Sequence, residues 1–148
     1  MRMVTHKHGD GGFTVMELMV VTAIAAVVMG IAIPSFLTWL PTLRLSSAAR
    51  QVATDLQVAR MKAISQNASN TVTFASGTYT FTLSPTDSRN VGQLYPGITV
   101  TSPSNPTFSP RGTATAAVTI TLSNGSATTL VCVKTVGRVN IQNSASCT

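Results

Sequence analysis

The chain has 148 residues, a formal net charge of +6, and only 9% charged against 44% hydrophobic residues. One domain fits this length, and the low charge argues against an intrinsically disordered chain, which usually combines high charge with few hydrophobic residues. The four acidic residues are widely separated and both histidines lie among the first eight residues, so we expect no catalytic residue, no cofactor and no metal site.

The first expected element is a long apolar helix. After a polar segment, residues 1–12, the chain carries no formal charge from Leu18 to Leu43. At about 1.5 Å per residue this run gives a helix of roughly 39 Å, which is enough to cross a hydrocarbon core of about 30 Å. The alternative is an ordinary signal peptide cut near Ala23-Ile24-Ala25, although the run is longer than the usual apolar region of about 7–15 residues.

One acidic residue, Glu17, interrupts the start of the apolar segment. A carboxylate in the middle of a membrane helix costs about 2.5–3.5 kcal/mol, so such a residue is expected to have a function. The alternative is that Glu17 lies near the membrane surface and points toward the headgroups.

The residues around Glu17 resemble a type IV prepilin signal, because Gly12-Phe13-Thr14-Val15-Met16-Glu17 follows a short basic leader and precedes an apolar run. The resemblance implies cleavage between Gly12 and Phe13 by a prepilin peptidase, followed by N-methylation of Phe13. It also implies that the helix is retained as a membrane anchor and later as a filament core. Glu17 would then pair with the Phe13 ammonium of a neighbouring subunit and set the register of assembly, since opposite charges in low dielectric cost less together than apart.

The second half of the helix has a different pattern. Apolar residues recur at spacings of three and four, which predicts an amphipathic helix to about Asn67: Leu45, Ala49, Val52, Leu56, Ala59 and Ala63. We expect this stripe to pack on the following sheet rather than to bind a partner. Pro34 and Pro41 are expected to kink the helix, because proline removes a hydrogen bond and crowds the preceding turn.

Beyond Asn67 the sequence is rich in Thr, Ser, Val and Gly, and it favours short strands with two hairpins around Ser76-Gly77 and Asn124-Gly125. The expected strands are Thr71–Ala75, Thr78–Leu83, Ile98–Thr101, Ala116–Leu122, Ala127–Val133 and Val136–Ile141. Ser84–Gly97 and Ser102–Pro106 are expected to be loops, because they are rich in Pro, Gly, Asn and Ser. The expected fold class is α+β: a long N-terminal hydrophobic helix packed through its C-terminal half on an antiparallel β-sheet head.

Two motifs in the head narrow the resemblance. Phe108–Ala114 and Val136–Val139 resemble the FimT/GspH group of minor pilins and type II secretion pseudopilins. The resemblance implies a leader of residues 1–12, a transmembrane and filament-core helix of residues 13–43, and a periplasmic head of residues 44–148. It places the chain in the bacterial inner membrane with a single pass. The implied partners are other pilins or pseudopilins of the filament and the prepilin peptidase/methyltransferase.

Both cysteines, Cys132 and Cys147, lie in the expected head. Outside the cytoplasm an even pair suggests a disulfide, which would tie the C-terminus to the last hairpin and stabilise the fold by about 3 kcal/mol. Two free thiols, with Cys132 buried in a strand, are the alternative.

The expected head is basic, with eight Lys and Arg against Asp55 and Asp87. A basic surface attracts nucleic acid, anionic headgroups or acidic proteins. Some FimT-type minor pilins bind DNA through a C-terminal Gly-Arg-x-Arg motif, and the matching stretch here is Gly137-Arg138-Val139-Asn140, with asparagine in place of the second arginine. Candidate DNA contacts are Arg138, Lys134 and Arg111; isolated solvated arginines are the alternative.

The sequence thus predicts a structural minor pilin or pseudopilin, assembled into a type II secretion pseudopilus or a type IV pilus and supporting protein secretion or pilus biogenesis. A DNA-binding minor pilin in natural transformation is one alternative. Another is a membrane protein unrelated to pili, which would keep its N-terminus at Met1. The two filament machines share the same leader, helix and head, so the choice between them stays open.

Overall fold

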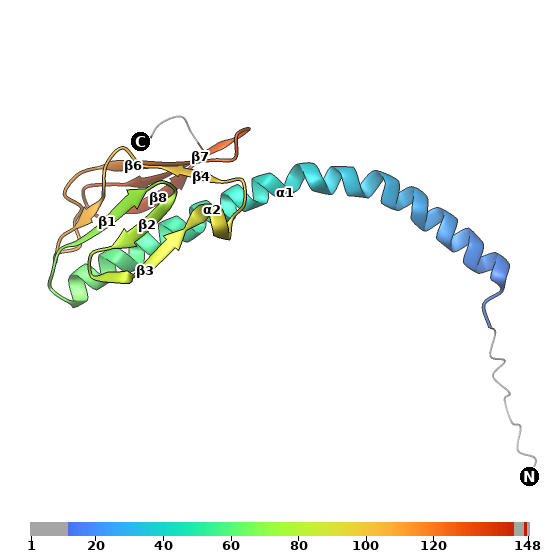
Figure 1. Cartoon of the computed structure of the whole chain (residues 1–148), viewed down its shortest axis with the longest axis horizontal. Coiled ribbons are helices and arrows are strands. Elements are labelled where there is room, and N and C mark those ends of the chain that lie inside the picture. The colour runs from blue at the N-terminus through green and yellow to red at the C-terminus, as the bar shows by residue number, and fades with distance from the viewer. Residues whose placement is uncertain (1–11, 144–146, 148) are drawn as a thin grey trace, which may run out of the picture. The chain divides into compact units, whose positions relative to one another are not determined.

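The computed structural model describes residues 12–143 and 147, and the chain divides into two units, Met1–Thr38 and Trp39–Thr148. One helix, α1 (Val15–Ser65), belongs partly to each unit (Figure 1). Residues 1–11 of the expected leader lie outside the described residues. The helix is uninterrupted at positions 34 and 41, and a bend at these prolines stays a prediction.

The first unit is the apolar part of α1. Val15–Ile33 has a mean hydropathy of 2.4 and none of it is buried within the structure, so by length and composition it is able to cross a membrane. The hydroxyl of Thr22 donates to the carbonyl oxygens of Leu18 and Met19, each at 3.0 Å. Its polar group is therefore satisfied within the helix, as a hydrocarbon environment requires.

The second unit is built on the other half of α1. All six residues of the expected apolar stripe are buried, with exposures of 2% or less, whereas Arg50 and Gln57 are exposed. The interpretation of this stripe as a core face is confirmed.

Two antiparallel four-stranded sheets complete the second unit (Figure 1). The first sheet has the order β3-β2-β1-β5, from Ser84–Asn90, Thr78–Phe81, Asn70–Ala75 and Thr107–Phe108. The second has the order β4-β6-β7-β8, from Thr99–Thr101, Val118–Ser123, Thr128–Val133 and Val139–Gln142. The core joins α1 to both sheets, through residues such as Leu56, Tyr79 and Ile120.

Both expected hairpins are confirmed. Ser76 and Gly77 have φ values of 47° and 78°, the left-handed pair that suits a tight turn between β1 and β2. In the β6–β7 turn, the Asn124 side chain accepts hydrogen bonds from the backbone N–H groups of Ser126 and Ala127 at 3.0 and 2.7 Å. Local turn chemistry therefore fixes the register of both hairpins.

The expectation of a loop over Ser84–Gly97 is wrong, because this segment forms β3 and the short helix α2 (Val91–Leu94). β3 lies at a sheet edge and its inner residues are exposed, so it shows no apolar alternation, and Pro85 is tolerated where no further strand pairs. The strand expected over Val136–Ile141 begins only at Val139, because the backbone N–H of Lys134 donates to the Arg138 carbonyl and closes a turn.

Candidate functional site

The N-terminus of α1 is capped by Thr14. The Thr14 hydroxyl accepts from the backbone N–H of Glu17 at 3.2 Å, and its carbonyl accepts from the N–H of Leu18 at 3.1 Å. These bonds satisfy donors that the first helical turn leaves free, and Glu17 in that turn complements the positive end of the helix dipole. Phe13 precedes the helix and is 83% exposed.

Glu17 is the only charged residue between positions 12 and 38. Around it, large apolar side chains of the first unit, such as Met16, Leu18 and Ile24, are 60% or more exposed. A continuous apolar surface of this kind marks a contact with lipid or protein. The Glu17 carboxylate, in the first helical turn, is thus the one charged group of this surface.

A second group of candidate residues lies in the head, where three segments meet: the end of α1, the loop 109–114 and the β7–β8 turn. The Nε of Arg60 donates to the Gly112 carbonyl at 2.7 Å, and the N–H of Ala114 donates to the Thr135 carbonyl at 2.9 Å. We call four basic residues of these segments the basic cluster: Arg60, Arg111, Lys134 and Arg138. Lys62, also near the end of α1, is left out because it pairs with Asp87.

Two glycines allow these segments to approach one another. Gly112 and Gly137 have φ values of 80° and 79°, a region that favours glycine. A Cβ atom on Gly137 would lie 1.9 Å from the Gly112 carbonyl oxygen and 2.8 Å from the Nε of Arg60. Only glycine at position 137 leaves room for the loop beside it.

The structure thus brings the segments of the sequence-predicted residues Arg111, Lys134 and Arg138 together. Arg111 and Arg138 are exposed and Lys134 is half-buried, and within residues 12–143 and 147 no member of the basic cluster forms an ion pair. The Nε of Arg138 donates to the side-chain oxygen of Asn140 at 2.9 Å. Asn140, which replaces the second arginine of the motif, therefore orients the first.

Sequence reasoning did not single out Arg60 as a member of this cluster. One feature of the sequence points to Arg60: it follows Ala59 at the border of the apolar stripe. A long side chain at such a position reaches over the core. Its partner, the Gly112 carbonyl, is 52 residues away, and no local pattern identifies such a distant acceptor.

The acidic residues of the head are engaged elsewhere. The buried Asp55 accepts hydrogen bonds from the Tyr79 hydroxyl at 2.5 Å and from the Gln51 amide at 3.0 Å, and the Arg89 Nε lies 3.9 Å from it. Burial, and then the hydrogen bond and charge of Asp55, raise the pKa of Tyr79 far above its ordinary value. Asp87 pairs with Lys62 at 3.3 Å. Neither carboxylate neutralises the basic cluster.

Asn70 is a further residue that sequence reasoning missed. It is fully buried at the start of β1, its amide nitrogen donates to the Ala59 carbonyl at 2.9 Å, and its amide oxygen accepts from the N–H of Leu83 at 3.2 Å. One side chain thus joins α1 to two segments of the first sheet. A lone asparagine at a strand start gives no sign of this role in sequence.

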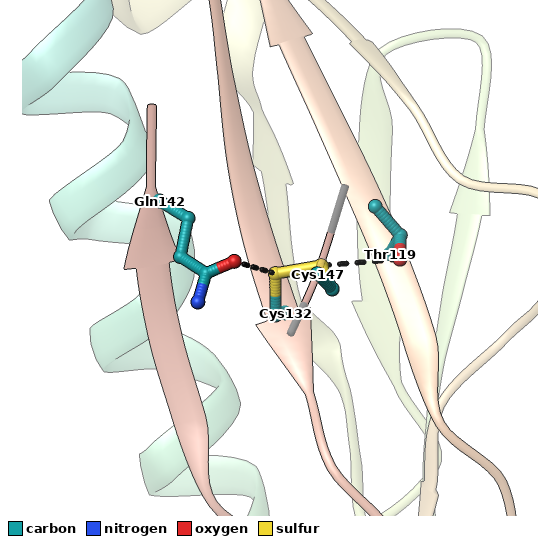
Figure 2. The surroundings of a disulfide bond; sticks show 4 residues. All are labelled: Thr119, Cys132, Gln142 and Cys147. Carbon is teal, nitrogen blue, oxygen red and sulfur yellow. Dashed lines mark hydrogen bonds between the residues drawn. A yellow bond between two sulfur atoms is a disulfide. The ribbon is translucent and has the colours of Figure 1, made fainter. Parts of the chain in front are cut away.

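Cys132 of β7 and Cys147 form a disulfide with their Cα atoms 5.7 Å apart. Figure 2 shows the bond between Thr119, whose hydroxyl donates to the Cys147 sulfur at 3.2 Å, and Gln142, whose Oε1 lies 3.7 Å from the Cys132 sulfur. The bond attaches the end of the chain to the middle of the second sheet. Among the residues that the structure describes, no group of three His, Cys, Asp or Glu is placed to hold a metal.

An apolar helix that leads into an antiparallel β head defines a pilin-like fold, and solved structures with this fold are found. Two crystal forms of the type IV minor pilin FimU from Pseudomonas aeruginosa superpose with TM-scores of 0.56 and 0.57 at 17% and 18% identity. The matches cover 66% of this chain and 92% and 87% of those chains.

Family models give the more specific result. The model of the type II transport protein GspH matches residues 48–137, and that of the prokaryotic N-terminal methylation motif matches residues 7–33. The chain belongs to the GspH family of minor pilins and pseudopilins, which are structural proteins. None of the curated proteins compared with the chain matches it.

Proposed function

We propose that the chain is a minor pilin or pseudopilin that is cleaved between Gly12 and Phe13, N-methylated on Phe13 and assembled through α1 into a filament. Before assembly, residues 13–43 anchor it in the bacterial inner membrane with the head, residues 44–148, in the periplasm. The filament is a type II secretion pseudopilus or a type IV pilus, and the work of the chain is to support protein secretion or pilus biogenesis.

The observation that carries this proposal is the single carboxylate in an otherwise uncharged, exposed helical segment. Glu17 lies four residues after Phe13 in the sequence, and the amine of Phe13 becomes a cation after cleavage. In a staggered assembly the ammonium of one subunit meets the carboxylate of the next, and pairing removes most of the cost of holding either charge in low dielectric. The methylation motif over residues 7–33 supports the same processing step.

Mass spectrometry of the chain purified from its native membrane tests the proposal. We expect the mature N-terminus to be methylated Phe13. A Gly12→Ala variant should stay unprocessed, with Gly30→Ala, a glycine within the apolar helix, as the matched control. An intact N-terminus at Met1 in the unaltered protein would refute the proposal in favour of a membrane protein unrelated to pili.

A second function, DNA binding during natural transformation, is favoured by the basic cluster, whose side chains form no ion pair within the described residues. We expect the full chain in detergent micelles to bind duplex DNA with a steep dependence on salt. Arg138→Ala should weaken binding and reduce the salt slope by about 1, whereas Arg44→Ala, an exposed arginine outside the cluster, should not. Binding that is absent or insensitive to salt would remove this candidate.

A further inference from the structure

A groove of about 380 Å³ lies between the last turns of α1 and the start of β8. Its apolar lining is Met61, Ile64, Val136 and Val139, and Arg60 and Arg138 form its basic rim. We call it the α1–β8 groove. It belongs entirely to the second unit.

The apolar lining is unusually open to solvent. Met61 is 67% exposed, Val136 64% and Ile64 48%. Single exposed apolar residues are normal on a protein surface, but three that converge on one concave site mark a contact. The groove therefore has the character of a docking site.

The walls of the groove are held in place before any partner arrives. Arg60 is fixed by its bond to the Gly112 carbonyl, Gly137 packs on the same carbonyl, and Arg138 is oriented by Asn140. Docking on such a site costs little ordering entropy.

The charges of the head decide what kind of partner fits. Arg60 and Arg138 form no ion pair within residues 12–143 and 147, so they attract acidic groups. A second copy of the head is a poor match, because residues 44–148 hold eight basic and two acidic side chains. Both acids are already engaged, Asp55 by Tyr79 and Asp87 by Lys62.

We propose that the α1–β8 groove docks an acidic segment with an apolar anchor residue, carried by a different subunit of the same filament. The anchor fills the space between Met61, Ile64 and Val136, and its acidic neighbours meet Arg60 and Arg138. This inference rests on the proposed function, because it requires the chain to stand in a filament of mixed composition.

Site-specific photocrosslinking in native cells tests the proposal. A benzophenone amino acid replaces Val136 in the full chain, and in the control it replaces Leu94, a residue of α2 that is 55% exposed outside the groove. In isolated filaments we expect an adduct from position 136 but not from position 94. Its partner peptide should be rich in Asp and Glu and come from another chain with a prepilin leader.

Charge reversal supplies a second measurement. Arg138→Glu should lower the yield of this adduct about fivefold or more, and an acid-to-lysine change in the crosslinked peptide should restore it. Because Arg138 is exposed, the variant should keep the thermal unfolding temperature of the parent.

The outcomes separate the two proposals. If the chain is present in filaments but position 136 gives no adduct, or gives adducts with its own copies, lipid or DNA, the groove proposal is overturned alone. If the chain keeps Met1 and is absent from filaments, the proposed function fails, and the groove proposal fails with it.

Discussion

At the scale of single residues, Gly137 has the least room for a side chain among the glycines of the described residues. Gly137→Ala would place a methyl group against the Gly112 carbonyl oxygen and impose a left-handed conformation on alanine. We expect a loss of about 2–5 kcal/mol in the free energy of unfolding, from the two costs together. Urea unfolding of the full chain in detergent measures it.

A substitution at Gly125 measures the cost of the left-handed conformation without the cost of a steric clash. Gly125 has a φ of 87°, but a Cβ atom there would meet nothing within 4 Å. Gly125→Ala should therefore lose only about 1 kcal/mol. Equal losses in the two variants would show that the close approach of Gly112 and Gly137 contributes nothing.

Tyr79 gives the head a dependence on alkaline pH. Its pKa is raised in the folded state by burial and by Asp55, so folding favours the protonated hydroxyl. The resulting stability is fully present below the ordinary pKa of about 10 and is lost progressively as the pH rises above it. Tyr79→Phe should abolish this alkaline decline and cost about 1–3 kcal/mol at neutral pH.

Unfolding measured from pH 7 to 11 checks the Tyr79 prediction. Tyr95→Phe is the matched control, because it removes a half-buried tyrosine and leaves the bond to Asp55 in place. The control should keep the alkaline decline. If the stability of Tyr79→Phe falls equally at alkaline pH, groups other than Tyr79 cause the decline.

At the scale of elements, the disulfide holds the end of the chain on β7. Cys147→Ser should lower the free energy of unfolding by about 3 kcal/mol, as expected for a closed loop of about 15 residues. A reductant should produce the same loss in the unaltered chain and none in the variant. If the reductant has no effect on either protein, the bond contributes no stability.

Elements that carry their own periodicity or turn chemistry could be predicted from sequence. The buried stripe of α1 followed from spacings of three and four, and the hairpins followed from Ser76-Gly77 and Asn124-Gly125. β3 could not be predicted, because an edge strand is held by backbone pairing to β2 and its exposed side chains carry no alternation. β5 has two residues and depends on pairing with β1.

The candidate site likewise contains some residues that sequence could identify and others that it could not. The methylation motif, which matches residues 7–33, could be recognised from sequence because its residues are contiguous. Arg60 could not be assigned to the basic cluster, since Gly112 lies 52 positions further along the chain and all four strands of the first sheet come between them. The role of Asn140 depends on the hydrogen bond that it accepts from the Arg138 side chain. The sequence of the motif alone does not reveal this bond.

At the scale of the whole molecule, the proposed assembly assigns Glu17 the contact with a neighbouring subunit. Glu17→Ala should reduce incorporation into filaments at least about tenfold, because the Phe13 ammonium of the adjoining subunit is left unpaired in low dielectric. Processing should continue, since the proposed cleavage bond, Gly12–Phe13, lies outside the helix that carries Glu17. Quantitative immunoblots of membrane and filament fractions measure both steps.

Thr22→Ala is the matched control for Glu17→Ala. It removes a side chain whose bonds stay within the helix, so incorporation should be unchanged. Normal incorporation of Glu17→Ala would show that register is set by apolar packing alone.

Three of the side-chain hydrogen bonds between α1 and the rest of the head lie close together along the helix, which has a mechanical consequence. Tyr79 donates to Asp55, Asn70 donates to the Ala59 carbonyl, and Arg60 donates to the Gly112 carbonyl. A pull along the helix would load these bonds side by side, in shear, within less than two helical turns. In the proposed filament, tension along α1 would load these bonds together with the packed core between the helix and the sheets.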